Sequence, residues 1–222
     1  MSPRDRFLKY GAGPVSDALD KGGAMDHGRM PWSAVAKMAG PAYTVLVHTA
    51  DILMVSKALA ECPAGHVLVI DGHGEKNTAL WGGLTTFSAY RKKLAGIVID
   101  GAIRDLADIR GSKLPVFARA VVANAGGAEY AGKLQVPVSC GGQVVQPGDW
   151  LVGDDDGVVV IPVGRLEEVL DKAGRIVEAE KVIAKAIRNG VDVAALLKID
   201  EKLAKKAGEV FVPQLQVEKG TG

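Results

Sequence analysis

One cation and two carboxylates follow a predicted buried strand in the segment VIDGAIRDLADIR, residues 98–110. The apolar start predicts a strand that ends at Asp100, and Arg104, Asp105 and Asp108 come soon after a turn. Arginine offers a fixed planar cation to carboxylate or carbonyl oxygens, whereas aspartate oxygens bind divalent metal ions. The same side chains would also suit a solvated helix face, with Arg104 and Asp108 as an i,i+4 pair. The segment alone leaves both interpretations open.

Helical phasing separates the packing residues of this segment from its charged residues. A helix over Ala102–Arg110 turns by about 100° per residue, so its side chains fall on two arcs. We expect the first arc to pack on the core and the second to face a ligand or solvent. The first arc holds Ile103, Leu106, Ala107 and Arg110, and the second holds Arg104, Asp105 and Asp108.

Two consecutive glycines, Gly82 and Gly83, lie upstream in NTALWGGLTTF. Glycine in a helix interior costs about 1 kcal/mol relative to alanine, so this pair suits the start of a helix better. The N–H groups at a helix start can hold a carboxylate or a phosphate. Close packing against a neighbouring strand would explain the two glycines equally well.

The elements that must position these residues follow an α/β pattern. Short runs rich in Val and Ile, each followed by glycine, aspartate or a polar turn, are typical of buried strands. Helical segments at Asp51–Glu61 and Asn77–Leu94 separate the first three runs, which predicts β-α-β crossovers and a partly parallel sheet. Such sheets bind ligands beyond the carboxyl ends of their strands. The predicted strands are Tyr43–His48, His66–Asp71, Gly96–Asp100 and Pro115–Arg119.

The pattern changes near Ala128, where short strands alternate with turns such as CGGQ, QPGD and GDDDG. We expect a compact antiparallel or barrel-like layer there, followed by a long helix over Gly164–Asn189 and a second helical region, Asp192–Ala207. This division predicts a domain over 1–163 and a C-terminal helical extension over 164–222 that packs on the domain or on a neighbouring subunit. The predicted short strands are Val136–Ser139, Gln143–Val145, Trp150–Val152 and Val158–Pro162.

Composition limits the functional classes. The chain has 27 basic and 26 acidic residues among 222, which gives no broad positive surface for nucleic acid. Apolar runs are broken within about ten residues, too short to span a membrane, and the N-terminus lacks the apolar segment of a signal peptide. Cys62 and Cys140 form no CxxC pair and fit a reduced protein. We therefore expect a cytoplasmic protein without a nucleic-acid or membrane partner.

Two familiar motifs are incomplete. The segment VIDGHGEKN contains Gly72 and Gly74, but Asn77 stands where a dinucleotide-binding fingerprint requires its third glycine. The acidic turn GDDDG at 153–157 matches a calcium loop over three residues only, since Val158 stands at position five of the loop and the terminal glutamate is missing.

The spacing from Gly83 to Arg104, Asp105 and Asp108 matches the pattern G-x20-R-D-x2-(E/D). With PVSCGGQVVQPGDWLVGDDDGVVVIP at 137–162, it resembles the family of the regulator of ribonuclease activity A and the class II 4-hydroxy-4-methyl-2-oxoglutarate/4-carboxy-4-hydroxy-2-oxoadipate aldolases. The similarity covers roughly Gly13 to Ile187. It implies a swivelling β/β/α domain, assembled as a homotrimer or as a hexamer of two trimers with sites at subunit boundaries.

The resemblance also implies chemistry. Members use a divalent metal ion, usually Mg²⁺ and alternatively Mn²⁺ or another divalent ion, and act on small 2-oxo acids to form pyruvate. Asp105 would bind the metal, with Asp108 in its second coordination sphere. Arg104 would contact the 2-oxo and carboxylate oxygens of the substrate. The pyruvyl carboxylate would bind the amides around Gly82, Gly83, Leu84 and Thr85.

At one position the sequence departs from the aldolases, which tend to begin the motif with aspartate where this chain has Gly83. Retro-aldol cleavage requires removal of a hydroxyl proton, so losing an acid there weakens the case for it. Decarboxylation of oxaloacetate needs only an electron sink. We therefore expect oxaloacetate decarboxylation to be better supported than aldol cleavage.

Two further expectations concern the C-terminal part. Glu180 falls in the middle of an apolar stripe of the long helix, and a buried glutamate must be paired or functional. Because the family places an acid of a neighbouring subunit near the metal, Glu180 is a candidate to contact it through water. A salt bridge is the alternative.

The rival function for the whole chain is that of a non-catalytic regulator that binds a ribonuclease assembly. The extension after Gly190 favours the enzyme over this regulator.

Overall fold

The computed structural model describes residues 1–26 and 30–206. Its strands are β1 (Met30–Pro31), β2 (Met38–Leu46), β3 (Val67–Trp81), β4 (Gly96–Ile103), β5 (Val116–Val121), β6 (Lys133–Leu134), β7 (Val138–Cys140), β8 (Gln143–Val145), β9 (Trp150–Asp154) and β10 (Gly157–Ile161). Its helices are α1 (Pro3–Tyr10), α2 (Ala12–Ala18), α3 (Leu53–Glu61), α4 (Gly83–Arg91), α5 (Leu106–Gly111), the short 3₁₀ turn η1 (Val163–Arg165), α6 (Leu166–Arg188), α7 (Val193–Leu196) and α8 (Ile199–Lys206).

A parallel sheet forms the centre of the fold. Strands β2, β3, β4 and β5 run parallel, as the β-α-β pattern predicts, and β9 and β10 extend the sheet in antiparallel fashion beyond β2. Within the described residues this sheet has eight strands in the order β1-β5-β4-β3-β2-β9-β10, with β6 paired to β2. β4 is buried along its whole length because both faces of the sheet are covered.

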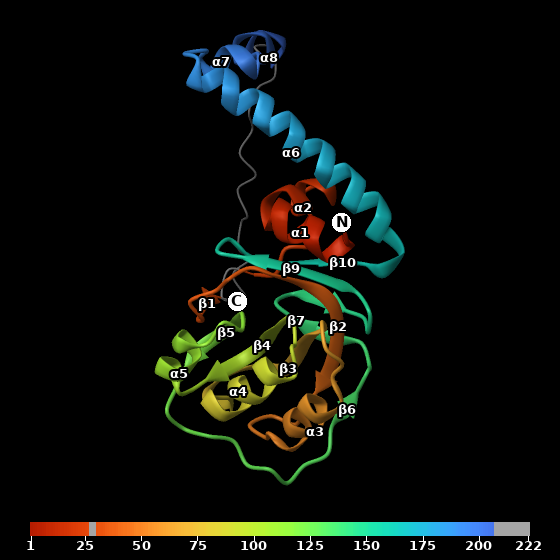
Figure 1. The fold of residues 1–222 in the computed structure, drawn as a ribbon, viewed down its shortest axis with the longest axis vertical. Coiled ribbons are helices and arrows are strands. Elements are labelled where there is room, and N and C mark those ends of the chain that lie inside the picture. Colours follow the sequence, from red (N-terminus) through yellow and green to blue (C-terminus); the bar gives the residue numbers. More distant parts are fainter. Residues whose placement is uncertain (27–29, 207–222) are drawn as a thin grey trace, which may run out of the picture. The chain divides into compact units, whose positions relative to one another are not determined.

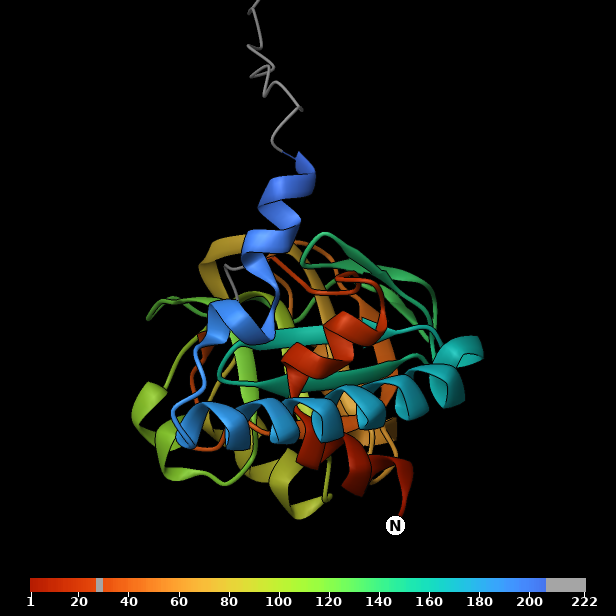
Figure 2. The same ribbon diagram turned by 90° about the horizontal axis from the view of Figure 1, so that it is seen from above.

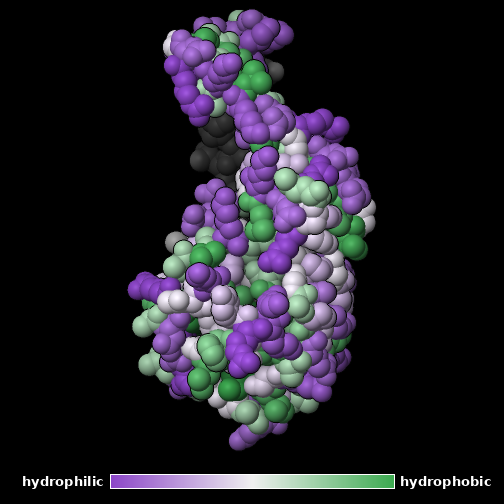
Figure 3. Space-filling model, in the orientation of Figure 1, coloured by the Kyte–Doolittle hydropathy of each residue, from purple (hydrophilic) through white to green (hydrophobic). Residues whose placement is uncertain are grey.

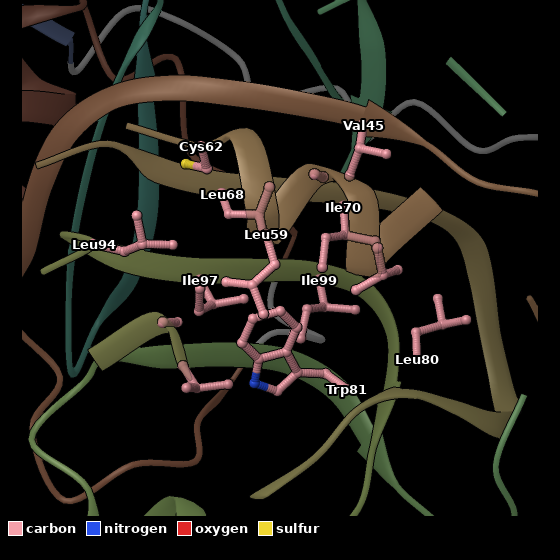
Figure 4. Packing of buried hydrophobic residues seen from close by; sticks show 14 of the residues in the cluster. Val45, Leu59, Cys62, Leu68, Ile70, Leu80, Trp81, Leu94, Ile97 and Ile99 are labelled. Carbon is pink, nitrogen blue, oxygen red and sulfur yellow. The ribbon is translucent and has the colours of Figure 1, made fainter. Parts of the chain in front are cut away.

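Helices cover one face of this sheet. In Figure 1, α3, α4 and α5 lie together on one side of β2–β5. Alternate strand residues point to this face and form a core cluster with residues of the three helices. Figure 4 shows side chains from β3, β4 and α3 gathered around Trp81. Each apolar side chain fully buried in this way contributes about 1.5–3 kcal/mol to folding.

The other face packs on the β7–β8 pair. The intervening residues of the parallel strands, among them Val69, Val98 and Phe117, form a second cluster with Val138 and Val145 of that pair. The β7–β8 pair, the parallel sheet and the helices α3, α4 and α5 therefore form three successive layers. This confirms the α/β class and the β/β/α arrangement expected for a swivelling domain, with helices late in the chain.

The N-terminal helices pack where β9 and β10 extend the sheet. Figure 2 shows α2 lying over β9 and β10, and α1 lies against β2. A third cluster joins both helices to the beginning of α6 through Val169, Leu170 and Ala173. By its internal contacts, the chain divides into two units, Met1–Val177 and Glu178–Gly222. The sequence boundary at 163/164 falls just before α6, whereas the first unit continues into this helix.

One predicted helix starts too early. The segment expected to be helical over Asn77–Leu94 continues β3 as far as Trp81, and α4 starts only at Gly83. β3 follows β4 through the polar DGHGEKN stretch with three register shifts, beginning between Asp71 and Glu75. Positive φ angles at His73 and Gly74 accompany the first shift. Bulges of this kind hide a long strand from period-based prediction.

Both cysteines are buried. Burial raises the pKa of the Cys62 thiol to about 12. The predicted helix Asp192–Ala207 is divided into α7 and α8, and its last residue lies outside the described part of the chain. Within residues 1–26 and 30–206, no helix is long and apolar enough to cross a membrane.

Candidate active site

A cavity of about 180 Å³ lies where β3 and β4 end. Arg104 and Asp105 line it directly after β4, and Trp81, Gly82 and Thr85 line it at the junction of β3 and α4. Ligands bind at this edge in parallel α/β sheets. The wall is completed by Ile52, Ala79, Leu80, Leu84 and Ala125. Of the residues predicted from sequence, Arg104, Asp105, Gly82, Leu84 and Thr85 therefore line one cavity.

Asp105 has an unusual backbone conformation, with φ 55° and ψ 45° in the left-handed region. Aspartate tolerates this region better than most residues, and such conformations cluster at functional sites. The Gly83 N–H donates to Oδ2 of Asp105 at 3.0 Å, and the carbonyl of Asp105 accepts from Asp108 N–H and Ile109 N–H. These contacts fix the carboxylate against the start of α4.

Two carboxylates approach the glycine pair closely. A Cβ added at Gly82 would lie 2.6 Å from Oδ2 of Asp105. A Cβ added at Gly83 would collide with Oδ2 of Asp108 and lie 3.0 Å from its Cβ. Gly82 precedes α4 and Gly83 is its first residue, so the prediction of a helix start is confirmed. The Asp108 carboxylate thus occupies the space that a side chain at position 83 would fill.

The amides at the start of α4 divide into two kinds. Gly82 N–H donates to Oγ1 of Thr85 at 3.0 Å, and Gly83 N–H donates to Asp105, so both are used within the protein. For the N–H groups of Leu84 and Thr85, the structure records no acceptor in the described part of the chain. The first N–H groups of a helix lack intrahelical partners and attract anions.

Arg104 is held by its backbone while its side chain remains accessible. Its N–H donates to the carbonyl of Trp81 at 2.9 Å. Its Nε lies 3.7 Å from Oδ2 of Asp105, and the two side chains are 46% and 41% exposed. An exposed pair at this distance stabilises the fold little, which leaves the guanidinium able to bind a ligand.

The helical phasing of this segment is partly wrong. Ile103 is the last residue of β4, and α5 begins only at Leu106. Within α5, Ala107 of the predicted packing arc is exposed, whereas Ile109, which belongs to neither arc, is buried. Because Asp105 has a left-handed backbone conformation, a helical period counted from Ala102 does not continue into α5. Arg104, Asp105 and Asp108 are nevertheless exposed, as predicted.

The burial argument for Glu180 is wrong. Glu180 is exposed, and no described residue after Val177 is buried. The apolar stripe continues in sequence through Ala184 and Ile187, but Ile187 is exposed and Ala184 is only half-buried. Burial within the single chain therefore does not place Glu180, and its contact with the metal ion of a neighbouring subunit stays a prediction.

Oxygen donors dominate the candidate site. Asp105 and Asp108 supply carboxylates, and Mg²⁺ is commonly bound through one or two carboxylates while it keeps several waters. No group of three or more His, Cys, Asp or Glu side chains is placed to hold a metal ion within residues 1–26 and 30–206. This donor set fits Mg²⁺ or Mn²⁺ and does not fit a zinc centre closed by protein ligands.

Asp51, which no sequence pattern indicated, is buried and holds the segments next to the cavity wall together. Its Oδ2 accepts the N–H groups of Glu129 and Tyr130, at 2.7 and 3.1 Å, and its Oδ1 accepts Leu53 N–H at 2.8 Å. Burial raises the pKa of this carboxyl, but the three N–H donors outweigh burial and hold the pKa below its usual value. The place of Asp51 as the first residue of a predicted helix was the one sequence feature that could have indicated this role.

Fold and site together define an α/β protein in which a cation and a carboxylate, Arg104 and Asp105, line one cavity at the ends of two parallel strands. The profile of the RraA-like family, described as Aldolase/RraA, matches residues 13–160, and the chain belongs to this family. A protein of Halalkalibacterium halodurans with the provisional name 4-hydroxy-4-methyl-2-oxoglutarate aldolase is 38% identical over 177 residues, 80% of this chain and 84% of that protein.

Two further relatives come from Thermus. A 4-hydroxy-4-methyl-2-oxoglutarate aldolase of Thermus thermophilus is 34% identical over 67% of this chain and 90% of its own length. The structure of the RNA-processing inhibitor RraA from Thermus thermophilis aligns with a TM-score of 0.63 and 34% identity, covering 67% of this chain and 90% of that one. The family thus includes proteins named for catalysis and for inhibition.

We predict that Asp51→Asn lowers the free energy of unfolding by about 2 kcal/mol at pH 7, because a charged acceptor of three N–H groups is lost. The folded-state pKa is depressed, so the contribution is complete above the unfolded pKa of about 3.9 and disappears as the pH falls through the lower folded value. Urea unfolding from pH 7 to pH 3 measures this. The exposed Asp155→Asn serves as control, and equal destabilisation of both variants would contradict the assignment.

Proposed function

We propose that this chain is a divalent-metal-dependent carbon–carbon lyase that forms pyruvate from 2-oxo acids. The candidate reactions are retro-aldol cleavage of 4-hydroxy-4-methyl-2-oxoglutarate or 4-carboxy-4-hydroxy-2-oxoadipate, and decarboxylation of oxaloacetate. The observation that carries the proposal is the pairing of Arg104 with Asp105 in a cavity at the start of α4. The names of the aldolase relatives support the same class of reaction.

The site offers two means of binding a 2-oxo acid. The N–H groups of Leu84 and Thr85 can donate to the substrate carboxylate at the positive end of α4. The Arg104 guanidinium can then donate to the adjacent 2-oxo oxygen. Both groups are held by backbone contacts of β3 and β4, so the substrate would be oriented without rearrangement of the chain.

Both reactions break the bond between C3 and C4 of the substrate. The electron pair of that bond stays on the pyruvyl unit, which becomes an enolate. Arg104 stabilises the developing negative charge on the former 2-oxo oxygen, and protonation at C3 completes pyruvate. A divalent metal held by Asp105, and through water by Asp108, would supply Lewis-acid stabilisation to the same oxygens when bound. No lysine is needed to form a Schiff base.

Asp108 bears on the balance between the two reactions. Retro-aldol cleavage removes a proton from the C4 hydroxyl, whereas decarboxylation releases CO₂ without a base. The Asp108 carboxylate lies where a side chain at position 83 would be, so an acid is present although Gly83 is not one. Asp108 is therefore the proposed acceptor of the hydroxyl proton, and both reactions belong to the proposal.

A homotrimer, alone or paired into a hexamer, is the proposed assembly. Leu84, Phe87 and Tyr90 on α4 are 88%, 63% and 49% exposed, and they line a groove of about 570 Å³ that also contains Gly83 and Asp108. On the face drawn in Figure 3, hydrophobic patches interrupt the hydrophilic surface toward the lower end, where Figure 1 places α3 and α4. An exposed apolar stripe of this kind is typical of an interface.

The competing function is inhibition of a ribonuclease assembly without catalysis. The structural similarity to the RNA-processing inhibitor RraA favours it, since both functions use the same fold. Turnover separates the two. If the Mg²⁺-loaded protein releases no pyruvate from oxaloacetate or either aldol substrate, the lyase proposal fails.

We predict that Asp105→Asn and Arg104→Ala each lower kcat for pyruvate release by about a hundredfold or more, as expected for loss of a group that stabilises developing charge. Asn keeps the tolerance for left-handed backbone, so Asp105→Asn should leave the melting temperature nearly unchanged. A lactate-dehydrogenase-coupled assay with Mg²⁺, and with EDTA, measures the effect. Arg110→Ala on α5 is the matched control, and near-wild-type activity in either site variant would refute the assignment.

We predict that Asp108→Ala lowers retro-aldol cleavage more than oxaloacetate decarboxylation, because only the first reaction needs a proton acceptor. Gly83→Asp alone should be destabilised by about 1–3 kcal/mol, since its Cβ collides with Asp108. The double variant Gly83→Asp/Asp108→Ala removes the contact with the Asp108 carboxylate, leaves the Cβ–Cβ contact of 3.0 Å, and should regain aldol cleavage relative to Asp108→Ala. An unchanged ratio of the two activities in all three variants would contradict this role.

We predict that Phe87→Lys dissociates the assembly, because a charge on the exposed stripe of α4 would be buried between subunits. Size-exclusion chromatography with light scattering measures the mass. Val144→Lys on β8 alters another exposed apolar side chain and should leave the mass unchanged. A monomeric wild-type protein, or a Phe87→Lys variant that keeps its full mass, would contradict the proposed interface.

A further inference from the structure

A second cavity, of about 480 Å³, lies at the opposite end of the parallel strands from the candidate active site. It is bordered by the segments that lead into β2, β4 and β5 and by the last turn of α4. The candidate active site, by contrast, follows the ends of β3 and β4. We call this second cavity the basic pocket. Its lining residues are Arg4, Val35, Lys37, Tyr90, Arg91, Lys93, Leu94, Ala95, Lys113, Leu114 and Pro115.

Five of the side chains that line the basic pocket are cationic, and no acidic residue lines it. These five cations belong to exposed residues, and none forms an ion pair with a carboxylate of the described chain. The whole protein has a net charge of only +1, so this concentration is local. The cations are Arg4, Lys37, Arg91, Lys93 and Lys113.

Local helix stabilisation does not explain this cluster. Arg91 lies in the last turn of α4, where a cation interacts favourably with the helix dipole, and Lys93 follows closely. Arg4, Lys37 and Lys113 come from three other parts of the chain. Like charges around one cavity repel one another, and an anion bound there would relieve that repulsion.

We propose that the basic pocket binds a small molecule that carries two or more phosphate groups. Each phosphate ester carries a charge of about −1.5 to −2 at pH 7, so two or three such groups would balance five cations. A carboxylate ligand would need about five carboxyl groups to do the same. The volume lies in the range of small-molecule sites, and Leu94, Ala95, Leu114 and Pro115 provide an apolar floor.

The probes are ATP, inorganic tripolyphosphate and citrate, titrated calorimetrically into the protein of residues 1–222 at low ionic strength. ATP and tripolyphosphate should bind, raise the melting temperature and bind more weakly as salt rises. Arg91→Gln/Lys113→Gln should weaken both by about a hundredfold, taking roughly tenfold for each lost charge-assisted contact. Lys9→Gln/Lys185→Gln removes the same charge from exposed positions outside the pocket and should leave affinity unchanged.

Three results would overturn the proposal. Equal affinity of ATP for the wild type and for Arg91→Gln/Lys113→Gln would place binding elsewhere. Tighter binding of citrate than of tripolyphosphate would exclude phosphate recognition. A short single-stranded RNA that binds the pocket where ATP does not would make it a nucleic-acid surface instead.

Binding at the two ends of the sheet can be separated. Arg104→Ala alters only the candidate active site, so ATP should bind this variant as it binds the wild type. Loss of ATP binding there would assign the polyphosphate to the active-site cavity and refute the basic pocket. The outcome does not depend on whether the protein releases pyruvate.

Discussion

The parallel pairing of β3 with β4 determines where the candidate site forms. The two strands stay paired through Trp81 and Ile103, and the Arg104 N–H closes the ladder on the Trp81 carbonyl. α4 leaves at the end of β3 and returns the chain to the start of β4, as Figure 1 shows. The twenty residues between Gly83 and Arg104 are therefore one helix, one turn and one strand. This crossover brings the two halves of the motif together.

Close approach then dictates residue types. The carboxylates of Asp105 and Asp108 lie so near the start of α4 that a Cβ at Gly82 or Gly83 would collide with them. Removing both side chains lets a backbone N–H reach Asp105, which offsets part of the strain of its left-handed conformation. Asp51 fixes the adjoining wall through three further N–H groups. Backbone N–H groups thus position the carboxylates of Asp105 and Asp51 at this end of the sheet.

Sequence patterns predicted the parts of this arrangement that depend on local chemistry. Val/Ile runs located the central strands, and the glycine pair located the start of α4, because burial and helix-start preferences act over a few residues. Phasing failed at Asn77–Trp81 and Ala102–Ile103, where bulges and a left-handed residue break any regular period. It also failed at Glu180, since amphipathicity does not reveal what a helix packs against. Asp51 and the basic pocket depend on segments that only the tertiary fold assembles.

The two ends of β4 carry the two proposed anion sites, which differ in kind. Beyond Ile103, the groups that would meet a ligand are backbone amides and one arginine tied to Trp81, so their positions are set by the sheet. Before Gly96, the cations are long exposed side chains carried by separate segments. Fixed donors favour a reaction whose charge develops at one atom, whereas adaptable cations favour binding by total charge. The crossover that assembles the first end therefore also separates it from the second by the length of a strand.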